Sequence, residues 1–420
     1  MKPSARTSVA LPFVLVSLLF MMWGVANNMN DTLLAAFKRI MSMSDLQTSL
    51  VQFAFFGAYF CFALPAALFI RRFSYKAGIL LGLAMYACGT MLFYPAGNAG
   101  SYAFFLFAIY IMAAGCSILE TTANPYILAM GDRATATRRL NIAQTFNPVG
   151  AMLGILLSRR FILSELHEAD AAARSDMSTE ALRTIQTQEL NAVSGTYLIV
   201  GAILAMLFVV ILLVRMPRLR DESASLPVGA TFRRLLRNRD YRLGVVAQFF
   251  YVGVQTGVWS FTIRLVMAET GQRESEAAMV FLWSILAFTL FRFIFTWLMR
   301  YFRPVKLLTL ASAVAMACVA CILLCHGTIV AVALVATSAA MSLMFPTIYG
   351  VALENVDPDS AKIAASGLIM AILGGALITP LQAFISDRAG ISASFVVPLV
   401  CFGVVLAYSL FVQKTHHKDN

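Results

Sequence analysis

Twelve long apolar runs, separated by charged or turn-rich connectors, constrain this chain more than any other feature. Each run is close to the roughly 20 residues that a helix needs to cross the hydrocarbon core of a bilayer. The runs are 11–36, 47–70, 77–95, 102–130, 139–163, 193–214, 242–268, 277–299, 306–325, 328–353, 363–386 and 393–413. Because only 13% of the 420 residues are charged, the chain cannot cover itself with charge as a soluble protein does. We therefore predict an all-α membrane protein with twelve transmembrane helices.

A basic connector, residues 215–241, lies at the middle of the chain and separates six predicted helices from six. We expect an N-terminal bundle of residues 1–214, a cytoplasmic middle loop of residues 215–241 and a C-terminal bundle of residues 242–420. The halves share short matches, RRFSYK with RYFRPVK and NPYI with FPTI, although matches this short also arise by chance. Secondary transporters are commonly built from such repeats, with the substrate site at the interface of the repeats.

The lysines and arginines concentrate in alternate connectors and at both ends of the chain. Under the positive-inside rule, this bias predicts that both termini are cytoplasmic and that the connector 164–192 lies outside. The net charge of +11 therefore needs no nucleic acid to explain it. The chain has no segment that suggests an obligatory protein partner or an added signalling domain, so we expect the lipid bilayer and a small-molecule substrate as its partners.

The sequence motifs do not favour an enzyme or a metal-binding site. The chain has no GxxxxGK[ST], HExxH or GxSxG sequence, so we expect neither ATP-driven transport nor an intramembrane hydrolase. Cys318, Cys321 and Cys325 have helical spacing, but no carboxylate or mid-membrane histidine accompanies them. Cysteine as a small apolar packing residue explains them better than a metal site does. We predict no bound cofactor and no metal.

Two acids stand within apolar runs, where an ionised side chain costs at least about 2.5–3.5 kcal/mol. Glu120 follows the apolar stretch from Tyr102 to Leu119, and its short side chain cannot easily reach water. Burial should bring the pKa of such a carboxyl towards the physiological range, where it can load and release a proton. Asp31 follows the amides Asn27 and Asn28. An interfacial or capping role is the alternative interpretation of Asp31. We predict that Glu120 and Asp31 couple proton movement to transport.

Amides and aromatic rings in several runs are suited to a neutral polyol, because amides bind hydroxyl groups and rings stack on the C–H face of a sugar. The candidate substrate-binding residues are Glu120, Asn27, Asn28, Asn124, Gln144, Asn147, Gln248, Tyr251, Gln255 and Trp259. The last four have the three- and four-residue spacing of one helix face. Hydrogen bonding between helices, which is common in membrane bundles, is the alternative explanation. The glycine pairs Gly78/Gly82 and Gly150/Gly154 predict close helix packing, and the prolines within the runs are expected to interrupt helices.

Several stretches together resemble one transporter family: ANNMNDTLL (26–34), RRFSYKAGILLGL (71–83), LETTANPY (119–126), LNIAQTFN (140–147), QFFYVGVQTGVWS (248–260), FPTIY (345–349) and ISDRAG (385–390). They resemble the fucose–galactose–glucose:proton symporters of the major facilitator superfamily. The resemblance implies the fold of that superfamily, two pseudo-symmetric six-helix bundles. It also implies that Asp31 and Glu120 take part in proton coupling and sugar binding, and that Gln144 contacts the sugar.

The resemblance implies proton-coupled import of a neutral monosaccharide, L-fucose or a related sugar, by alternating access across a bacterial inner membrane. Two alternatives remain open at this stage. A sodium-coupled sugar carrier is one, because carboxylates bind either ion. A proton-antiport exporter of a drug or metabolite is the other, although amide-rich segments argue against it.

Overall fold

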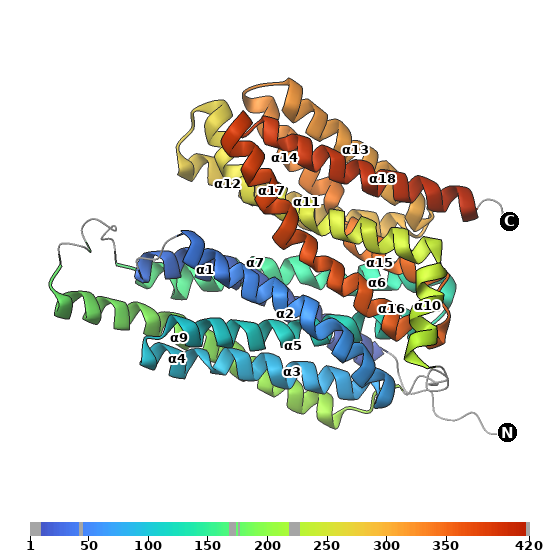
Figure 1. Cartoon of the computed structure of the whole chain (residues 1–420), viewed down its shortest axis with the longest axis horizontal. Coiled ribbons are helices and arrows are strands. Elements are labelled where there is room, and N and C mark those ends of the chain that lie inside the picture. The colour runs from blue at the N-terminus through green and yellow to red at the C-terminus, as the bar shows by residue number, and fades with distance from the viewer. Residues whose placement is uncertain (1–9, 42–44, 168–173, 175–176, 218–226, 417–420) are drawn as a thin grey trace. The chain divides into compact units, whose positions relative to one another are not determined.

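The computed structural model describes residues 10–41, 45–167, 174, 177–217 and 227–416, and every regular element within them is helical (Figure 1). The first half contains α1 (Ala10–Ile40), α2 (Asp45–Arg72), α3 (Tyr75–Met91), α4 (Phe93–Ala99), α5 (Tyr102–Ala129), α6 (Ala136–Gln144), α7 (Phe146–Phe161) and α9 (Thr179–Leu213). The second half contains α10 (Val228–Arg237), α11 (Arg239–Thr270), α12 (Glu274–Leu298), α13 (Pro304–Leu324), α14 (Thr328–Met341), α15 (Met344–Glu354), α16 (Pro358–Met370), α17 (Gly374–Ala389) and α18 (Val396–His416).

Eleven helical segments within the described residues are long and apolar enough to cross a membrane. They correspond to eleven of the twelve predicted runs. The remaining run, 242–268, forms the 32-residue helix α11, which has the length to span a bilayer. Amides such as Gln248 and Gln255 lower its apolarity. The prediction of an all-α fold from the apolar runs is confirmed.

Prolines break the helices at fewer places than the sequence predicts. Pro65 and Pro125 lie inside the continuous helices α2 and α5, and Pro380 lies inside α17, so the expected interruptions are absent there. Tolerance of this kind is usual in membrane helices, because neighbouring groups satisfy the freed carbonyl. The run 139–163 does divide into α6 and α7 just before Pro148, and the run 328–353 divides into α14 and α15 just before Pro346.

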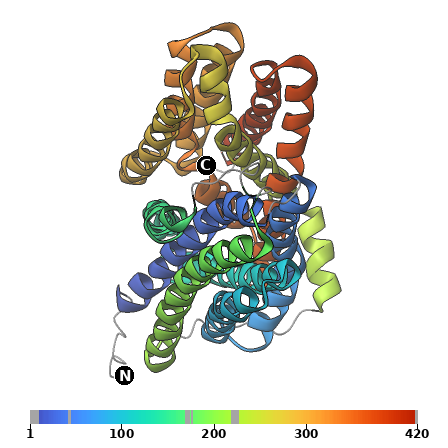
Figure 2. The same cartoon turned by 90° about the vertical axis from the view of Figure 1, so that its left-hand side faces the viewer.

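The chain forms two compact units. Unit 1 comprises residues 1–123 and 146–219, and unit 2 comprises residues 124–145 and 220–420. In unit 1, α7 packs along α1 and α9 packs along α3. In unit 2, α11 contacts α12, α15, α17 and α18, while α12, α13 and α14 lie together (Figure 2). The segment 124–145 belongs to unit 2 because α6 packs on α15. The division predicted at residues 215–241 stays a prediction.

Glycines allow α1 and α7 to approach closely. A Cβ atom on Gly150 would lie 1.9 Å from the backbone oxygen of Met21, and one on Gly154 would lie 2.8 Å from that of Val25. Gly78 and Gly82 on α3 show the same crowding, against Thr122 and Leu119 respectively. Because the blocking atoms at Gly150 belong to backbone, they have little freedom to move. The predicted packing role of both glycine pairs is confirmed.

Replacing Gly150 with valine is therefore expected to force α1 and α7 apart. Overpacking of this kind costs about 1–3 kcal/mol in well-packed cores. The midpoint of thermal unfolding of the detergent-purified protein should fall for Gly150→Val. Gly195→Val is the matched control, because a Cβ atom at Gly195 of α9 meets nothing within 4 Å. Equal stability of the two variants would contradict the packing role.

Glu269, in the last turn of α11 and just beyond the run 242–268, ties three parts of unit 2 together. Its carboxylate accepts hydrogen bonds from the Ser392 hydroxyl at 2.5 Å and from the backbone N–H of Gly327 at 3.4 Å, and lies 3.1 Å from His326 Nδ1. The Ser392 hydrogen bond, followed by the His326 and Gly327 contacts, holds the pKa of Glu269 below its usual value. The charged form of Glu269 thus stabilises the fold.

A depressed pKa in the folded state adds stability that is fully present above the unfolded-state pKa, about 4.3 for glutamate. This stability is lost as the pH falls through the folded-state pKa. We expect Glu269→Gln to lower the unfolding midpoint at pH 7, and the gap from the wild type to close below about pH 4. Thermal unfolding across this range, with the exposed Glu165→Gln as control, measures the effect. A gap that persists unchanged in acid would contradict it.

Candidate functional site

Glu120 is a buried carboxyl in unit 1. It lies on α5 with 2% of its surface exposed, and within the described residues no protein group hydrogen-bonds its Oε2 atom. Tyr59 of α2 lies within electrostatic range of it. A buried acid oxygen without a protein partner costs free energy comparable to a lost hydrogen bond, more when it is charged. The position therefore favours a group that takes up a proton or a ligand hydroxyl.

Tyr59 connects Glu120 to the first helix. Its hydroxyl accepts a hydrogen bond from the Trp23 indole N–H of α1, and its backbone oxygen accepts one from the Ser117 hydroxyl at 3.2 Å. Because Ser117 lies one turn before Glu120 on α5, the same contacts set the position of the acid. Sequence reasoning missed Tyr59 and Trp23, since aromatic residues are common in any apolar run.

The polar stretch of α1 meets α7. Asn27 and Asn28 are partly exposed, and the Asn28 amide bonds to the Gly24 backbone oxygen at 3.1 Å. Asn147 of α7 donates from its amide to the Phe20 backbone oxygen at 3.3 Å. Asn147 thus forms the interhelical hydrogen bond that was the alternative reading. The side chain of Asp31 lies outside the described residues, and its role stays a prediction.

In unit 2, the predicted amides Asn124 and Gln144 lie close to α6, which also carries Asn141. Gln144 donates from its amide to Asn124 Oδ1 at 2.7 Å, and both side chains are buried. Asn141 donates to the Thr347 hydroxyl of α15 at 3.3 Å. The protein supplies no partner among the described residues for Asn124 Nδ2 or Asn141 Oδ1. These two atoms retain hydrogen-bonding capacity that a polyhydroxylated ligand can use.

Arg292 of α12 caps two broken helices. Its Nε donates to the Ser342 backbone oxygen at 2.5 Å and its NH1 to the Gln144 backbone oxygen at 3.1 Å. These are the carbonyls four residues before Pro346 and Pro148, and a proline has no N–H to offer them. The guanidinium therefore satisfies the acceptor that each proline leaves free.

Burial makes Arg292 costly as well as useful. It is 3% exposed, and its guanidinium lies 4.8 Å from the centroid of the Phe288 ring. In the part of the chain that the structure describes, no carboxylate forms an ion pair with it. A lone buried cation is retained only where its hydrogen bonds are needed. Here they hold the end of α6, which carries Gln144, against the end of α14.

The predicted residues on one face of α11 differ in their hydrogen bonding. Tyr251 donates to the Met341 backbone oxygen at 2.9 Å, and the Trp259 indole donates to the Ser338 hydroxyl at 3.2 Å, so both bond to α14. Gln255 is partly exposed. Gln248 is fully buried, and neither amide atom has a protein partner among the described residues. Gln248 is thus the member of this face with free hydrogen-bonding capacity.

Sequence reasoning missed one amide of the same kind. Gln382 of α17 is fully buried, and within the described chain both of its amide atoms lack a partner. A Cβ atom on Gly257 of α11 would lie 2.3 Å from Gln382 Oε1, so glycine at that position makes room for the amide. The sequence could have indicated Gln382, because it is a glutamine within an apolar run, two residues after Pro380. No group of three metal-ligating side chains occurs in the described segments.

Comparisons with known proteins agree on one family. The family model described as Major Facilitator Superfamily matches residues 13–372. The L-fucose-proton symporter of Haemophilus influenzae is 40% identical over 96% of this chain and 97% of its own length. The L-fucose-proton symporter of Escherichia coli is 36% identical over 97% of this chain and 94% of its own length. A glucose/galactose transporter of Brucella abortus is 30% identical over 98% of this chain and 96% of its own.

The structure resembles solved transporters. It matches the crystal structure of FucP in the outward conformation with a TM-score of 0.90 at 36% identity, over 96% of this chain and 99% of that chain. A proton:xylose symporter, XylE, matches with a TM-score of 0.68 at 12% identity, over 97% of this chain and 96% of that chain. The second likeness concerns the fold alone.

Proposed function

This chain belongs to the Major Facilitator Superfamily, as its motifs predicted, and we propose that it is a proton-coupled symporter that imports a neutral monosaccharide, L-fucose first among them. The observation that carries the proposal is the identity of 36–40% over nearly the whole chain to proteins named L-fucose-proton symporters. The proteins named glucose/galactose transporters are less similar, at 30%. The named relatives are transporters rather than enzymes.

We propose that Glu120 is the main proton carrier and a ligand of the sugar. Its buried Oε2, which the described protein groups leave without a partner, supports both roles. A protonated Glu120 is neutral and donates a hydrogen bond, whereas an ionised one only accepts. Proton binding and sugar binding at one side chain are then linked, and each changes the affinity for the other by the same factor. Asp31 is proposed as the second coupling acid.

The proposed sugar ligands in unit 2 are Gln144 and three buried amides with unpartnered atoms among the described residues, namely Asn124, Gln248 and Gln382. Asn124, Gln144 and Gln248 were predicted from the sequence, and we add Gln382 to them. Asn27, Asn28, Asn147, Tyr251, Gln255 and Trp259 stay predicted contacts. No bound cofactor is proposed, because the energy comes from the ion gradient.

The protein is a multi-pass membrane protein. We propose that it lies in a bacterial inner membrane with both termini in the cytoplasm, as the distribution of its cations implies under the positive-inside rule. Alternating access of the two repeats then carries the sugar inward together with protons that move down their gradient.

Uptake of labelled L-fucose into proteoliposomes tests this function. The imposed gradient is an inward proton gradient, an inward sodium gradient or none, and the panel also contains D-glucose and D-galactose. Accumulation of L-fucose under the proton gradient alone is the expected result. Accumulation of another sugar instead would show that only the proposed substrate is wrong. Accumulation under the sodium gradient alone would show that the proposed coupling ion is wrong. Reconstituted, folded protein that moves no sugar under either gradient would refute the proposal.

A further inference from the structure

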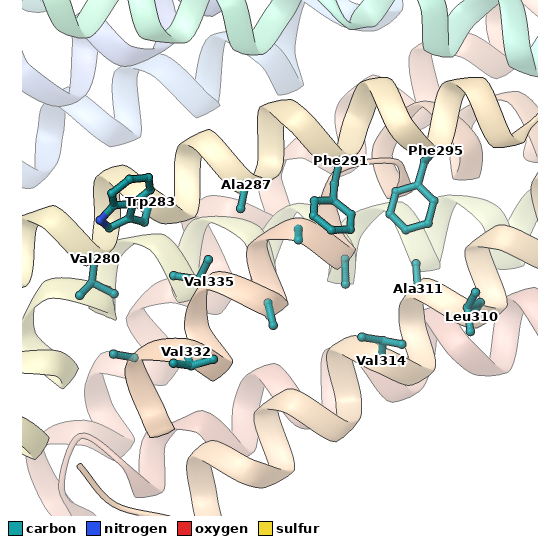
Figure 3. Close-up of a pocket in the computed structure, with 14 residues that line it drawn as sticks. Val280, Trp283, Ala287, Phe291, Phe295, Leu310, Ala311, Val314, Val332 and Val335 are labelled. Atoms are coloured by element: carbon teal, nitrogen blue, oxygen red, sulfur yellow. The ribbon is translucent and has the colours of Figure 1, made fainter. Parts of the chain in front are cut away.

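A long apolar groove runs along the outside of unit 2, between α12, α13 and α14 (Figure 3). It encloses about 700 Å³. Trp283, Phe291 and Phe295 of α12 line one wall, and Val314 of α13 and Val335 of α14 face them. Every lining residue is apolar in character.

Small residues on α14 create the groove. Its floor contains Ala331, Ala336, Ala339 and Ala340, whereas α12 presents large rings. The lining of α12 extends from Val280 to Phe295, about 22 Å of helix. This is longer than one leaflet of a hydrocarbon core about 30 Å thick. Because a gap left unfilled loses its dispersion contacts, a groove of this length on a membrane protein is suited to a flexible hydrocarbon chain.

Three cations stand at one end of the groove. Arg300, Arg303 and Lys306 are exposed in and just after the short connector from α12 to α13. Lys306 lies one helical turn before Leu310, which lines the groove, so it continues the α13 wall towards the connector. The sequence has no Asp or Glu between Glu276 and Glu354. Among the described residues, no carboxylate forms an ion pair with any of these three cations.

Aromatic residues mark the same end. Trp297 and Tyr301 are 53% and 67% exposed, and their rings stack edge to face with centroids 5.2 Å apart. Exposed Trp and Tyr are typical of the level at which lipid headgroups begin. The positive-inside rule alone accounts for cations in a cytoplasmic connector, but it does not account for a groove that leads to them.

We propose that this groove binds an anionic phospholipid. One acyl chain lies along α12, α13 and α14, and the headgroup phosphate lies at Arg300, Arg303 and Lys306. Basic sites between transmembrane helices are a recurrent means of holding anionic lipids. The site is separate from the sugar-binding residues, and its existence does not depend on the transported substrate.

Native mass spectrometry of the full-length protein in detergent, titrated with phosphatidylglycerol or phosphatidylcholine, tests the proposal. The headgroup variant is R300Q/R303Q/K306Q, and its control of equal charge loss is R233Q/R237Q/R242Q, which changes three exposed arginines on α10 and α11. The groove variant is A336F, with the milder A336L beside it. Its control is L290F, at an exposed α12 position that does not line the groove.

We expect the wild type to bind the first phosphatidylglycerol at least about tenfold more tightly than phosphatidylcholine. Each Lys or Arg near an anionic lipid raises the binding constant about fivefold, and the site has three of them. The headgroup variant should lose this preference, the groove variants should weaken the first binding event severalfold, and both controls should match the wild type. Equal binding of the two lipids would overturn the proposal, as would an unaltered headgroup variant or unaltered groove variants in folded protein. A protein dimer that the groove variants dissociate would identify a second copy of the chain as the occupant instead.

Discussion

Glu120→Gln is expected to abolish gradient-driven accumulation of the sugar. An amide has nearly the shape of a carboxyl but does not exchange a proton, so sugar movement loses its link to the gradient. A gradient of one pH unit supplies about 1.4 kcal/mol, enough for about tenfold accumulation at one proton per sugar. The ratio of internal to external L-fucose should therefore fall from about ten to about one in proteoliposomes containing the variant.

Counterflow exchange, in which internal unlabelled sugar drives entry of labelled sugar, needs no net proton movement. Its persistence in Glu120→Gln would show that the protein is folded and that only coupling is lost. Glu180→Gln, at an exposed position in the first turn of α9, is the matched control and should accumulate sugar like the wild type. Full accumulation by Glu120→Gln would show that Glu120 does not carry the coupled proton.

Arg292→Met is expected to lower the initial rate of uptake by about tenfold or more. A hydrogen bond from a charged group contributes about 1.5–3 kcal/mol, and one such bond holds the end of α6 that carries Gln144. Without the guanidinium, the carbonyls of Gln144 and Ser342 lose their donor, and neither Pro148 nor Pro346 can replace it. Stability should change less than uptake, because the variant also removes the cost of burying a cation.

Arg292→Lys separates charge from geometry. A lysine keeps the charge but lacks the planar fork that reaches two carbonyls at once, so we expect it to remain well below the wild type in uptake. Arg264→Met is the matched control, because Arg264 is exposed on α11 and its guanidinium lies 5.0 Å from the centroid of the Phe261 ring. Uptake and the unfolding midpoint are measured on all variants. Normal uptake by Arg292→Met would mean that the capped carbonyls do not position the site.

The candidate site was partly readable from the sequence. Glu120 stood out because an acid in a long apolar run is costly wherever that run lies, and this cost depends on local sequence alone. Gln248 and Gln144 stood out in the same way, as amides within apolar runs. Asn141, Tyr251 and Trp259 could not be assigned to interhelical bonds from the sequence, since their partners on α14 and α15 lie about 80–200 residues away.

Arg292 shows most clearly what the sequence leaves open. An arginine within an apolar run is costly and therefore unusual, but the two acceptors of Arg292 lie 148 and 50 residues away along the chain. The proline rule does identify Gln144 and Ser342 as carbonyls without a helical donor. Which side chain reaches them depends on how α12 packs against α6 and α14.

The twelve spanning segments and the buried acid can be predicted from the amino-acid sequence alone, because hydrophobic length and the cost of burying charge act within one segment. The family follows from the short motifs. Only the folded structure shows which helices break, the packing of residues 124–145 with unit 2, the two carbonyls that Arg292 caps, and the groove beside α12. The reason is that these features depend on the fit of side chains from distant segments. Such a fit is set by volume and hydrogen-bond geometry across helices, which no single stretch of sequence contains.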